Sequence, residues 1–337
     1  MPWITIAMIA CLAACRCSSK ESKMNERQVE PTAIQCWGRF CFDVPVSMVR
    51  NTGEYAVRGL TVWECEFEPP LQDAWKRTWN ERIAEIERLR TKRASPTDPR
   101  GTILEQRELI PGLLRAVLYV PDVDDESPNW AALLNSGPRG LWIEVSNSTA
   151  WIAAGRSREF KEEAVTLIRE VAKAYTPRTP DEAWPVPGKD WFYLNRGAIA
   201  LPTLPGAWTG DEETDVTFSS KDGKVEFEVE TRIAVEPDSR GMLQQFMDAA
   251  ADLGAHLHLS PSKHRRKRKV AGLEGGELII RDLDKGEVVF MWRFSGEASS
   301  GSRPKAELSL NATRETLEER QALWNRMLDS MRPAAGR

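Results

Sequence analysis

Histidine is the side chain that most often acts as a base or metal ligand near neutral pH, and this chain of 337 residues contains only three. His256 and His258 alternate, so on a strand both would point to the same face, and His264 follows as a third candidate ligand. His264 lies inside a basic run, however, which would repel a metal ion. A polar strand face beside a loop explains the histidines more simply, so we expect no metal site and no cofactor.

The motifs of the common hydrolases and nucleotide-binding enzymes do not occur in the sequence. The stretch closest to G-x-S-x-G, Gly296 to Gly301, places its serine one position too late for a nucleophile elbow. There is also no H-E-x-x-H, Walker loop or G-x-G-x-x-G. We therefore expect a protein that is not an enzyme. A hydrolase of unfamiliar type, which would have to use the three histidines, is the weakest alternative.

The cysteine at position 15 has the surroundings of a lipid attachment site. It ends the apolar run Trp3 to Ala14, and Leu-Ala-Ala precedes it directly, in the order that a bacterial lipoprotein signal requires. Small side chains fit the signal peptidase, and the thiol accepts a diacylglyceryl group. Because twelve apolar residues are too few to span a bilayer, we predict that residues 1–14 are a signal peptide and that Cys15 carries the lipid. An ordinary cleaved signal or an apolar disordered start are the alternatives.

This signal predicts a mature chain in the periplasm, anchored by lipid and not inserted, because no later stretch has the length of a membrane span. Arg16 stands where an inner-membrane retention signal has aspartate, which favours the outer membrane. Either membrane stays open.

Four further cysteines, all before residue 66, would remain in an oxidising compartment where disulfides form. Cys17, Cys36, Cys41 and Cys65 allow three pairings, and the sequence does not choose among them. We favour Cys36 with Cys65, because this bond would join two predicted strands.

The elements that would position these residues occur twice in the same order. A polar tether over residues 15–33 precedes an N-terminal domain at 34–176, and a proline-rich linker at 177–190 leads to a C-terminal domain at 191–333. In the first domain we expect strands at 36–45, 56–67, 102–109, 113–120, 140–146 and 149–154, helices at about 72–92 and 158–175, and a polar loop at 121–138. In the second we expect strands at 191–201, 216–218, 224–235, 276–283, 286–295 and 305–311, and helices at about 242–253 and 316–330.

This order indicates an α+β fold with two similar lobes. Each lobe would hold a mainly antiparallel sheet packed with two helices, in the order strands, helix, strands, helix. The residue-by-residue similarity of the two halves is weak, so a duplication rests on the order of elements alone.

Two features indicate partners. Thirteen tryptophans are present, and Trp130 and Trp208 fall in expected loops, where they could anchor a protein contact. The basic run Lys263 to Lys269 is expected to be a solvated loop, with contact to anionic headgroups or an acidic partner as the alternative. A net charge of −4 argues against a general nucleic-acid binder.

One known family shares short motifs with this sequence. Cys36 to Pro45 (C-x-G-R-F-x-x-D-V-P) resembles the start of the folded region in the immunity lipoproteins of type VI secretion lipase effectors. Val270 to Leu278, Phe290 to Gly296 and Arg303 to Leu310 resemble the C-terminal domain of that family. Cys41 departs from the pattern, because an aliphatic residue is expected there, and this leaves the pairing of Cys36 open.

The resemblance implies a two-domain α+β protein in the periplasm. It would bind an incoming phospholipase effector stoichiometrically and block it, which protects the cell's own membrane. The alternative is a structural or assembly lipoprotein of the cell envelope that has no toxin partner.

Overall fold

Alternation of apolar and polar residues builds most of this structure from strands. In β14 (Glu226–Arg232) buried and exposed side chains follow one another along the strand, as expected where one face of a sheet packs on a core. The computed structural model describes residues 30–51, 53–92, 97–121, 128–145, 160–178, 190–200, 212–233, 265–281, 287–313 and 316–334. All of these from Thr32 onward belong to one compact unit.

The first half of this unit, residues 32–178, contains ten strands and two α-helices among its described residues. The strands are β1 (Thr32–Trp37), β2 (Phe40–Pro45), β3 (Met48–Arg50), β4 (Glu54–Val57), β5 (Leu60–Glu66), β6 (Ile103–Ile110), β7 (Leu114–Tyr119), β8 (Asn129–Asn135), β9 (Arg139–Val145) and β10 (Tyr175–Pro177). The helices are α1 (Ala74–Arg88), flanked by the short 3₁₀ turns η1 (Leu71–Asp73) and η2 (Leu89–Lys92), and α3 (Phe160–Ala174).

The second half, residues 190–334, repeats this order as far as it is described. Its strands are β11 (Trp191–Tyr193), β12 (Gly197–Ala200), β13 (Glu213–Ser220), β14, β15 (Arg265–Val270), β16 (Leu273–Arg281), β17 (Glu287–Phe294), β18 (Lys305–Thr313) and β19 (Arg332–Pro333), and its described helix is α5 (Leu317–Ser330). The helix expected at 242–253 and the strand expected at 149–154 lie outside the described residues.

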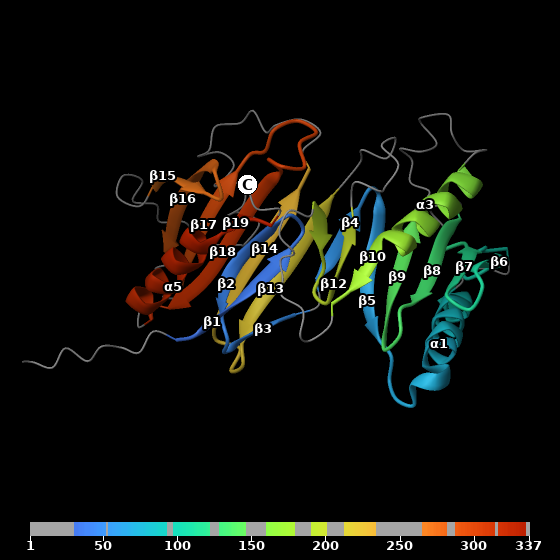
Figure 1. The fold of residues 1–337 in the computed structure, drawn as a ribbon. Helices are drawn as coiled ribbons and strands as arrows, with labels where there is room; N and C mark the ends of the chain where they lie inside the picture. Colours follow the sequence, from blue (N-terminus) through green and yellow to red (C-terminus); the bar gives the residue numbers. More distant parts are fainter. Residues whose placement is uncertain are drawn as a thin grey trace, which may run out of the picture. The chain divides into compact units, whose positions relative to one another are not determined.

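The two halves share one sheet, which corrects the expectation of a separate sheet in each lobe. Thirteen strands join in the order β15-β16-β17-β18-β14-β13-β4-β5-β9-β8-β7-β6, with β3 attached to β13 (Figure 1). The strand pairs of the described residues are antiparallel throughout, so the predicted α+β class with antiparallel pairing is confirmed. Sequence patterns show which face of a strand is buried but not which strand lies beside it, and β4 and β13 meet across more than 150 residues of chain.

Both halves have the same strand order. Six strands of each half, β4–β9 and β13–β18, follow one another across the large sheet. Numbered in chain order within their half and listed from the outer edge inwards, they run third, fourth, fifth, sixth, second, first. The first strands of the two sets, β4 and β13, meet at the centre. The meeting is antiparallel, with Tyr55 opposite Thr214. The sheet is therefore nearly symmetric about this seam.

Each half also completes a small sheet of the other. The hairpin β1–β2 pairs with β19, the last strand of the second half, and the hairpin β11–β12 pairs with β10, the last strand of the first half. Gly38 and Tyr193 exchange two backbone hydrogen bonds of 2.8 Å that tie the hairpins together. Gly38 has a φ of +50°, and a Cβ atom there would lie 3.0 Å from Thr214 Cγ2, so the turn requires glycine.

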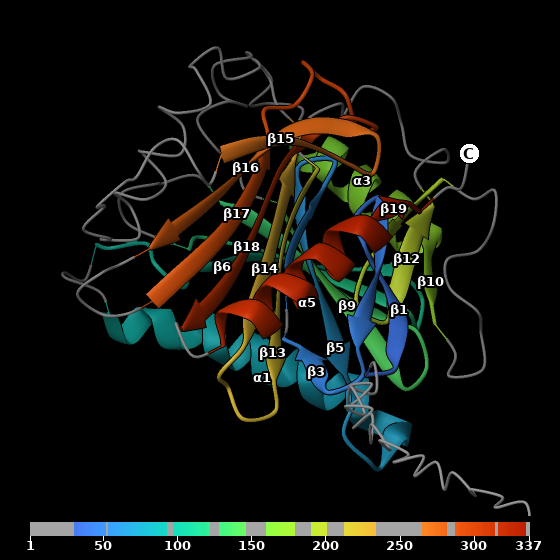
Figure 2. The same cartoon turned by 90° about the vertical axis from the view of Figure 1, so that its left-hand side faces the viewer.

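Helices α3 and α5 cover one face of the large sheet together with the two small sheets (Figures 1 and 2). The core on this side includes Leu118, Trp130 and Ala132 from neighbouring strands. On β7 and β8 the alternate residues Val117, Ala131 and Leu133 face α1 instead, which covers the opposite face in the first half. These central strands are thus buried on both faces, which explains their continuous apolar runs.

Candidate functional site

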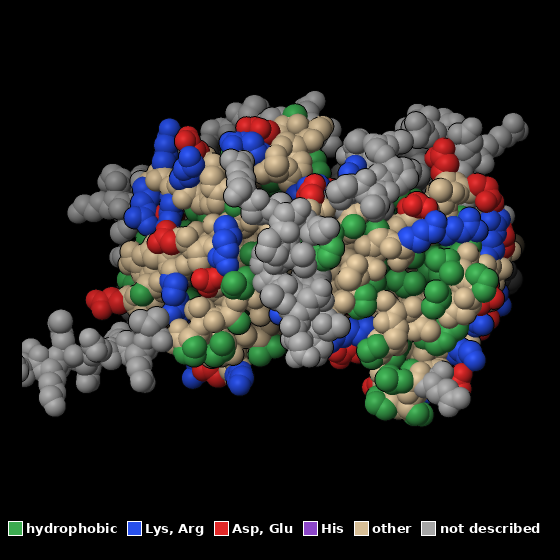
Figure 3. Space-filling model, in the orientation of Figure 1, with side chains coloured by type: hydrophobic (Ala, Val, Ile, Leu, Met, Phe, Trp, Pro, Cys, Tyr) green, Lys and Arg blue, Asp and Glu red, His purple; other side chains and the backbone are tan. Residues whose placement is uncertain are grey.

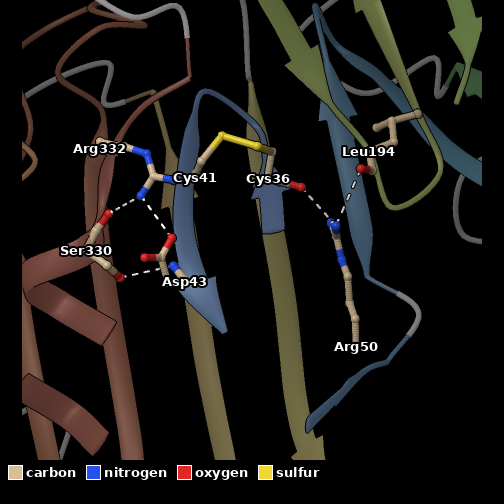
Figure 4. The surroundings of a disulfide bond; sticks show 7 residues. All are labelled: Cys36, Cys41, Asp43, Arg50, Leu194, Ser330 and Arg332. Carbon is tan, nitrogen blue, oxygen red and sulfur yellow. Dashed lines mark hydrogen bonds and ion pairs between the residues drawn. A yellow bond between two sulfur atoms is a disulfide. The ribbon is translucent and has the colours of Figure 1, made fainter. Parts of the chain in front are cut away.

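The disulfide of this protein closes the hairpin β1–β2. Cys36 and Cys41 are directly opposite each other in the hairpin register and are bonded to each other (Figure 4), whereas Cys65 is free. The favoured Cys36–Cys65 pairing is therefore wrong. Cys65 lies on β5 in the large sheet, and the close approach of Cys36 and Cys41 follows from the tight turn at Gly38.

Arg50 connects the hairpins of the two halves. Its guanidinium donates hydrogen bonds to the carbonyl oxygen of Cys36 at 2.9 Å and to that of Leu194 at 3.4 Å (Figure 4), and it also contacts the hydroxyl of Tyr55. The same cation lies over the rings of Tyr55 and Phe218, where cation–π attraction adds to the hydrogen bonds.

A second arginine ties the seam from the turn of the first hairpin. Arg39 forms two hydrogen bonds with the carboxylate of Glu212, at 2.6 and 2.9 Å, and a third with Asp190 at 2.9 Å. Glu212 is only 6% exposed and is also 3.7 Å from Arg58 Nε. A buried carboxylate held by a bidentate guanidinium fixes geometry more than it adds stability, so the junction between halves is rigid.

A cavity of about 300 Å³ opens beside this junction. The described residues that line it come from β4 and the residue before it, the end of β5, the start of β9 and the turn between β11 and β12: Gly53, Tyr55, Trp63, Glu64, Cys65, Glu66, Arg139, Asn195 and Arg196. Its volume is at the lower end of the range for ligand pockets, which is room for a side chain and its flanking backbone.

The carboxylate of Glu64 is the most deeply placed acid of this cavity. It accepts a hydrogen bond from the backbone N–H of Arg196 at 2.7 Å and one from the Tyr175 hydroxyl at 3.2 Å. Burial raises the pKa of Glu64, and the N–H of Arg196 opposes that rise. Burial likewise raises the pKa of the Cys65 thiol, so this cysteine has little thiolate and is a poor nucleophile.

An acidic row crosses the face of the large sheet away from α5. Glu54, Asp215, Glu230 and Glu307 stand opposite one another on the adjacent strands β4, β13, β14 and β18. Arg293 pairs with Glu307 at 3.0 Å, and Lys305 is 4.0 Å from Glu230. Burial and the charges of Glu230 and Glu54 raise the pKa of Asp215.

The described part of the basic run, from Arg265 onward, is a strand and not the loop that the sequence predicted. Residues Arg265–Val270 form β15, the edge strand at one end of the sheet. Arg266 and Arg268 turn towards the buried carboxylate of Glu277, at 2.6 and 3.3 Å, and Trp324 Nε1 donates to the same carboxylate at 2.7 Å. Figure 3 shows basic and acidic side chains interleaved at this end of the molecule. The run therefore neutralises an internal acid and protects a sheet edge.

The predicted contact tryptophans do not form a surface in the described residues. Trp130 has no exposed area and lies on β8, so its expected place in a loop was wrong, and it cannot anchor a partner. The stretch Asn129–Asn135, which the sequence placed in a polar loop, is the whole of strand β8. Trp208, the predicted lipid attachment site Cys15, and the three histidines lie outside the described residues. Seven of the nine described tryptophans are buried, which accounts for much of their abundance.

Among the described residues no group of acids, histidines and cysteines could hold a metal ion. In the same part of the chain, no helix is long and apolar enough to cross a membrane.

Comparison with known proteins defines the class. Residues 194–336 match the family described as Tle cognate immunity protein 4 C-terminal domain. Cognate immunity proteins are binding inhibitors rather than enzymes, so the expectation that this chain is not an enzyme is confirmed. Over this C-terminal stretch the chain is similar to immunity proteins cognate to Tle effectors, in agreement with the sequence resemblance.

Solved structures show the same fold. An apo structure of TplEi, an immunity protein of the type VI secretion system of Pseudomonas aeruginosa, is 19% identical, with a TM-score of 0.64 over 91% of this chain and 98% of that one. The immunity chain in the Tle4–Tli4 complex is 18% identical and has the same TM-score and coverage. TplEi complexed with "L" peptide is 17% identical, with a TM-score of 0.62 over 90% of this chain and 98% of that one. No curated protein matches this sequence.

Replacing Asp215 with asparagine should stabilise the protein at pH 7. The substitution removes a charge placed directly between two other acids, and such like-charge pairs cost about 0.5 kcal/mol each. Because the folded-state pKa of Asp215 is raised, the wild type gains stability as the pH falls through that value, and the advantage of the variant shrinks. Urea unfolding between pH 7 and pH 4 measures both effects.

The matched control is Asp222→Asn in the turn after β13. The Ser220 hydroxyl lowers the pKa of Asp222 to about 2, so its ionised form is favoured by folding, and the control should lower stability at pH 7. An equal change in both variants would contradict an origin of the effect in the acidic row.

Replacing Glu277 with glutamine should destabilise the protein by about 2 kcal/mol, because Arg268 and Trp324 lose a charged acceptor in a buried position. Glu274→Gln, on the same strand and exposed, should change stability by about 0.5 kcal/mol or less. Chemical unfolding of the two variants makes the comparison. If the basic run made no structural contact with Glu277, both variants would change stability by the same small amount.

Proposed function

We propose that this protein is a periplasmic immunity protein that binds a secreted lipase effector one to one and blocks it. The single observation that carries the proposal is the match of residues 194–336 to a family of immunity proteins cognate to Tle effectors, within a fold shared over 91% of the chain. The Tli4 protein of similar fold was solved in a complex with Tle4, which supports a protein effector as the partner.

The proposal includes a lipid anchor at Cys15. An anchored inhibitor stands next to the membrane whose lipids the effector attacks, so the local concentration of inhibitor is high where protection is needed. The support for this part is the signal sequence alone, with its small residues before the cysteine. The outer membrane is favoured because Arg16 follows the lipid attachment site.

Protection from the cognate lipase tests the proposal. A bacterial host that exports this lipase to its periplasm should lyse, and co-expression of the full chain should restore growth and yield a complex with one copy of each protein by light scattering. A catalytically dead lipase serves as the control for toxicity. Equal killing with and without the chain would leave the alternative, an envelope lipoprotein without a toxin partner.

The anchor is tested separately. Cys15→Ala should prevent incorporation of labelled palmitate and leave the protein unprocessed, whereas Cys17→Ala should be labelled like the wild type. Membrane fractionation then reports which membrane holds the labelled protein. Labelling that survives in Cys15→Ala would exclude this cysteine as the lipid attachment site.

A further inference from the structure

Strand β5 runs past its neighbour β4 at the centre of the sheet. β4 has only four residues, and its pairing with β5 extends no further than Tyr55 opposite Val62. β5 continues for four more residues and stays paired with β9 on its other side, as far as Glu66 opposite Arg139. The end of β5 therefore has one paired edge and one edge that no described strand covers.

The direction of the backbone groups follows from the ladder with β9. Phe67 N–H donates to the carbonyl oxygen of Pro138 at 3.1 Å, in register with the β5–β9 pairs. In an antiparallel ladder, residues alternate between bonding to one neighbour and bonding to the other. Cys65 thus bonds to β9, whereas the N–H and C=O groups of Glu64 and Glu66 point to the uncovered edge.

That edge forms a wall of the 300 Å³ cavity. Gly53 would continue the β4 register opposite Glu64, but the β4–β5 pairing ends at Tyr55. Gly53 lies close to β13, where a Cβ atom would be 2.5 Å from the Asp215 carbonyl oxygen. The Asn195–Arg196 turn of the second half also lines the cavity. The cavity is therefore a gap in the sheet with free main-chain donors and acceptors on one side.

The two ends of the large sheet are protected in ways that this inner edge is not. β15 carries the lysines and arginines that discourage strand addition. The pairing of β6 with β7 shifts register twice, which makes the outer strand irregular. At the end of β5, among the described residues, the comparable device is the ion pair between the exposed side chains of Glu66 and Arg196.

We propose that an extended segment of the lipase effector enters this cavity and pairs its main chain with β5 at Glu64 and Glu66. Strand addition of this kind takes affinity from main-chain hydrogen bonds and specificity from the pockets for alternate side chains. This inference rests on the proposed function and names the place and the chemistry of the contact.

The guest side chain beside Glu64 carries a hydrogen-bond donor. The Glu64 carboxylate accepts from Arg196 N–H and from the Tyr175 hydroxyl, and an ionised carboxylate has capacity for further donors. Arg50 and Arg139 act on Glu64 electrostatically, but neither forms an ion pair with it within 4.0 Å. A serine, threonine, asparagine or lysine of the effector fits this position, and an acidic residue does not.

Proline at position 66 separates main-chain recognition from side-chain effects. Glu66→Pro removes the N–H that faces the cavity and spares the ladder with β9, whereas Glu66→Ala removes the Arg196 ion pair and keeps the N–H. With the full chain and the cognate lipase, we expect Glu66→Pro to weaken binding about tenfold to a hundredfold and Glu66→Ala by about threefold or less. Equal affinities of the two variants, measured calorimetrically, would overturn the inference.

Hydrogen exchange in the wild type provides a second measurement in case Glu66→Pro does not fold. The amides of Glu64 and Glu66 should exchange fast in the free protein and at least tenfold more slowly in the complex, while the Cys65 amide is slow in both. A complex in which Glu64 and Glu66 remain fast would overturn this inference and leave the proposed function standing. A chain that forms no complex with the lipase would overturn both.

Discussion

The reciprocal completion of two small sheets is the constraint on which the rest of this structure depends. The first half ends in β10, which pairs only with β12 of the second half, and the second half ends in β19, which pairs with β2 of the first. Within each half the closing strand would have no described partner. The pairing of β4 and β3 with β13 then merges the two large sheets. Main-chain ladders therefore hold the halves together at both small sheets and along β13, and the Gly38–Tyr193 bridge adds to them.

Polar contacts at the seam follow from this exchange. Because the hairpins of both halves are brought side by side, one guanidinium, that of Arg50, reaches carbonyl groups of both, and Arg39 reaches Glu212 and Asp190. These contacts cross about 140 to 170 residues of chain. A junction fixed in this way presents its cavity and strand edge in one geometry before a partner arrives, which reduces the ordering cost of binding. A preformed surface of this kind suits the proposed function, in which the protein binds the lipase effector and blocks it.

Local sequence patterns predicted most helices and strands that the structure describes, because apolar periodicity reports directly on burial. The helical spacing around Trp75 and Trp79 gave α1, and that around Leu167 and Ile168 gave α3. The same patterns failed where the pairing of distant strands decides the outcome. Asn129–Asn135 becomes a central strand because β7 and β9 flank it, and a run of lysine and arginine becomes β15 because a buried glutamate on β16 neutralises it.

The site was less accessible from the sequence than the fold. Glu64 and Glu66 look like ordinary exposed acids on an edge strand, and only the different lengths of β4 and β5 create the gap beside them. The motif C-x-G-R-F did contain a signal, because its glycine and arginine form the turn and the ion pairs of the seam. The short spacing of Cys36 and Cys41 around that glycine could have indicated the disulfide as a hairpin bond.

The central claim is that the two halves form one interlocked unit. Cutting the chain between them is the most direct test. A protease site placed within residues 179–189 allows the backbone of the folded protein to be cleaved, and gel filtration then shows whether the fragments separate. The account predicts that they stay together at the size of the intact chain and still bind the lipase, because β10–β12, β2–β19 and β4–β13 hold them without a covalent link. Two independently migrating, folded fragments would contradict it.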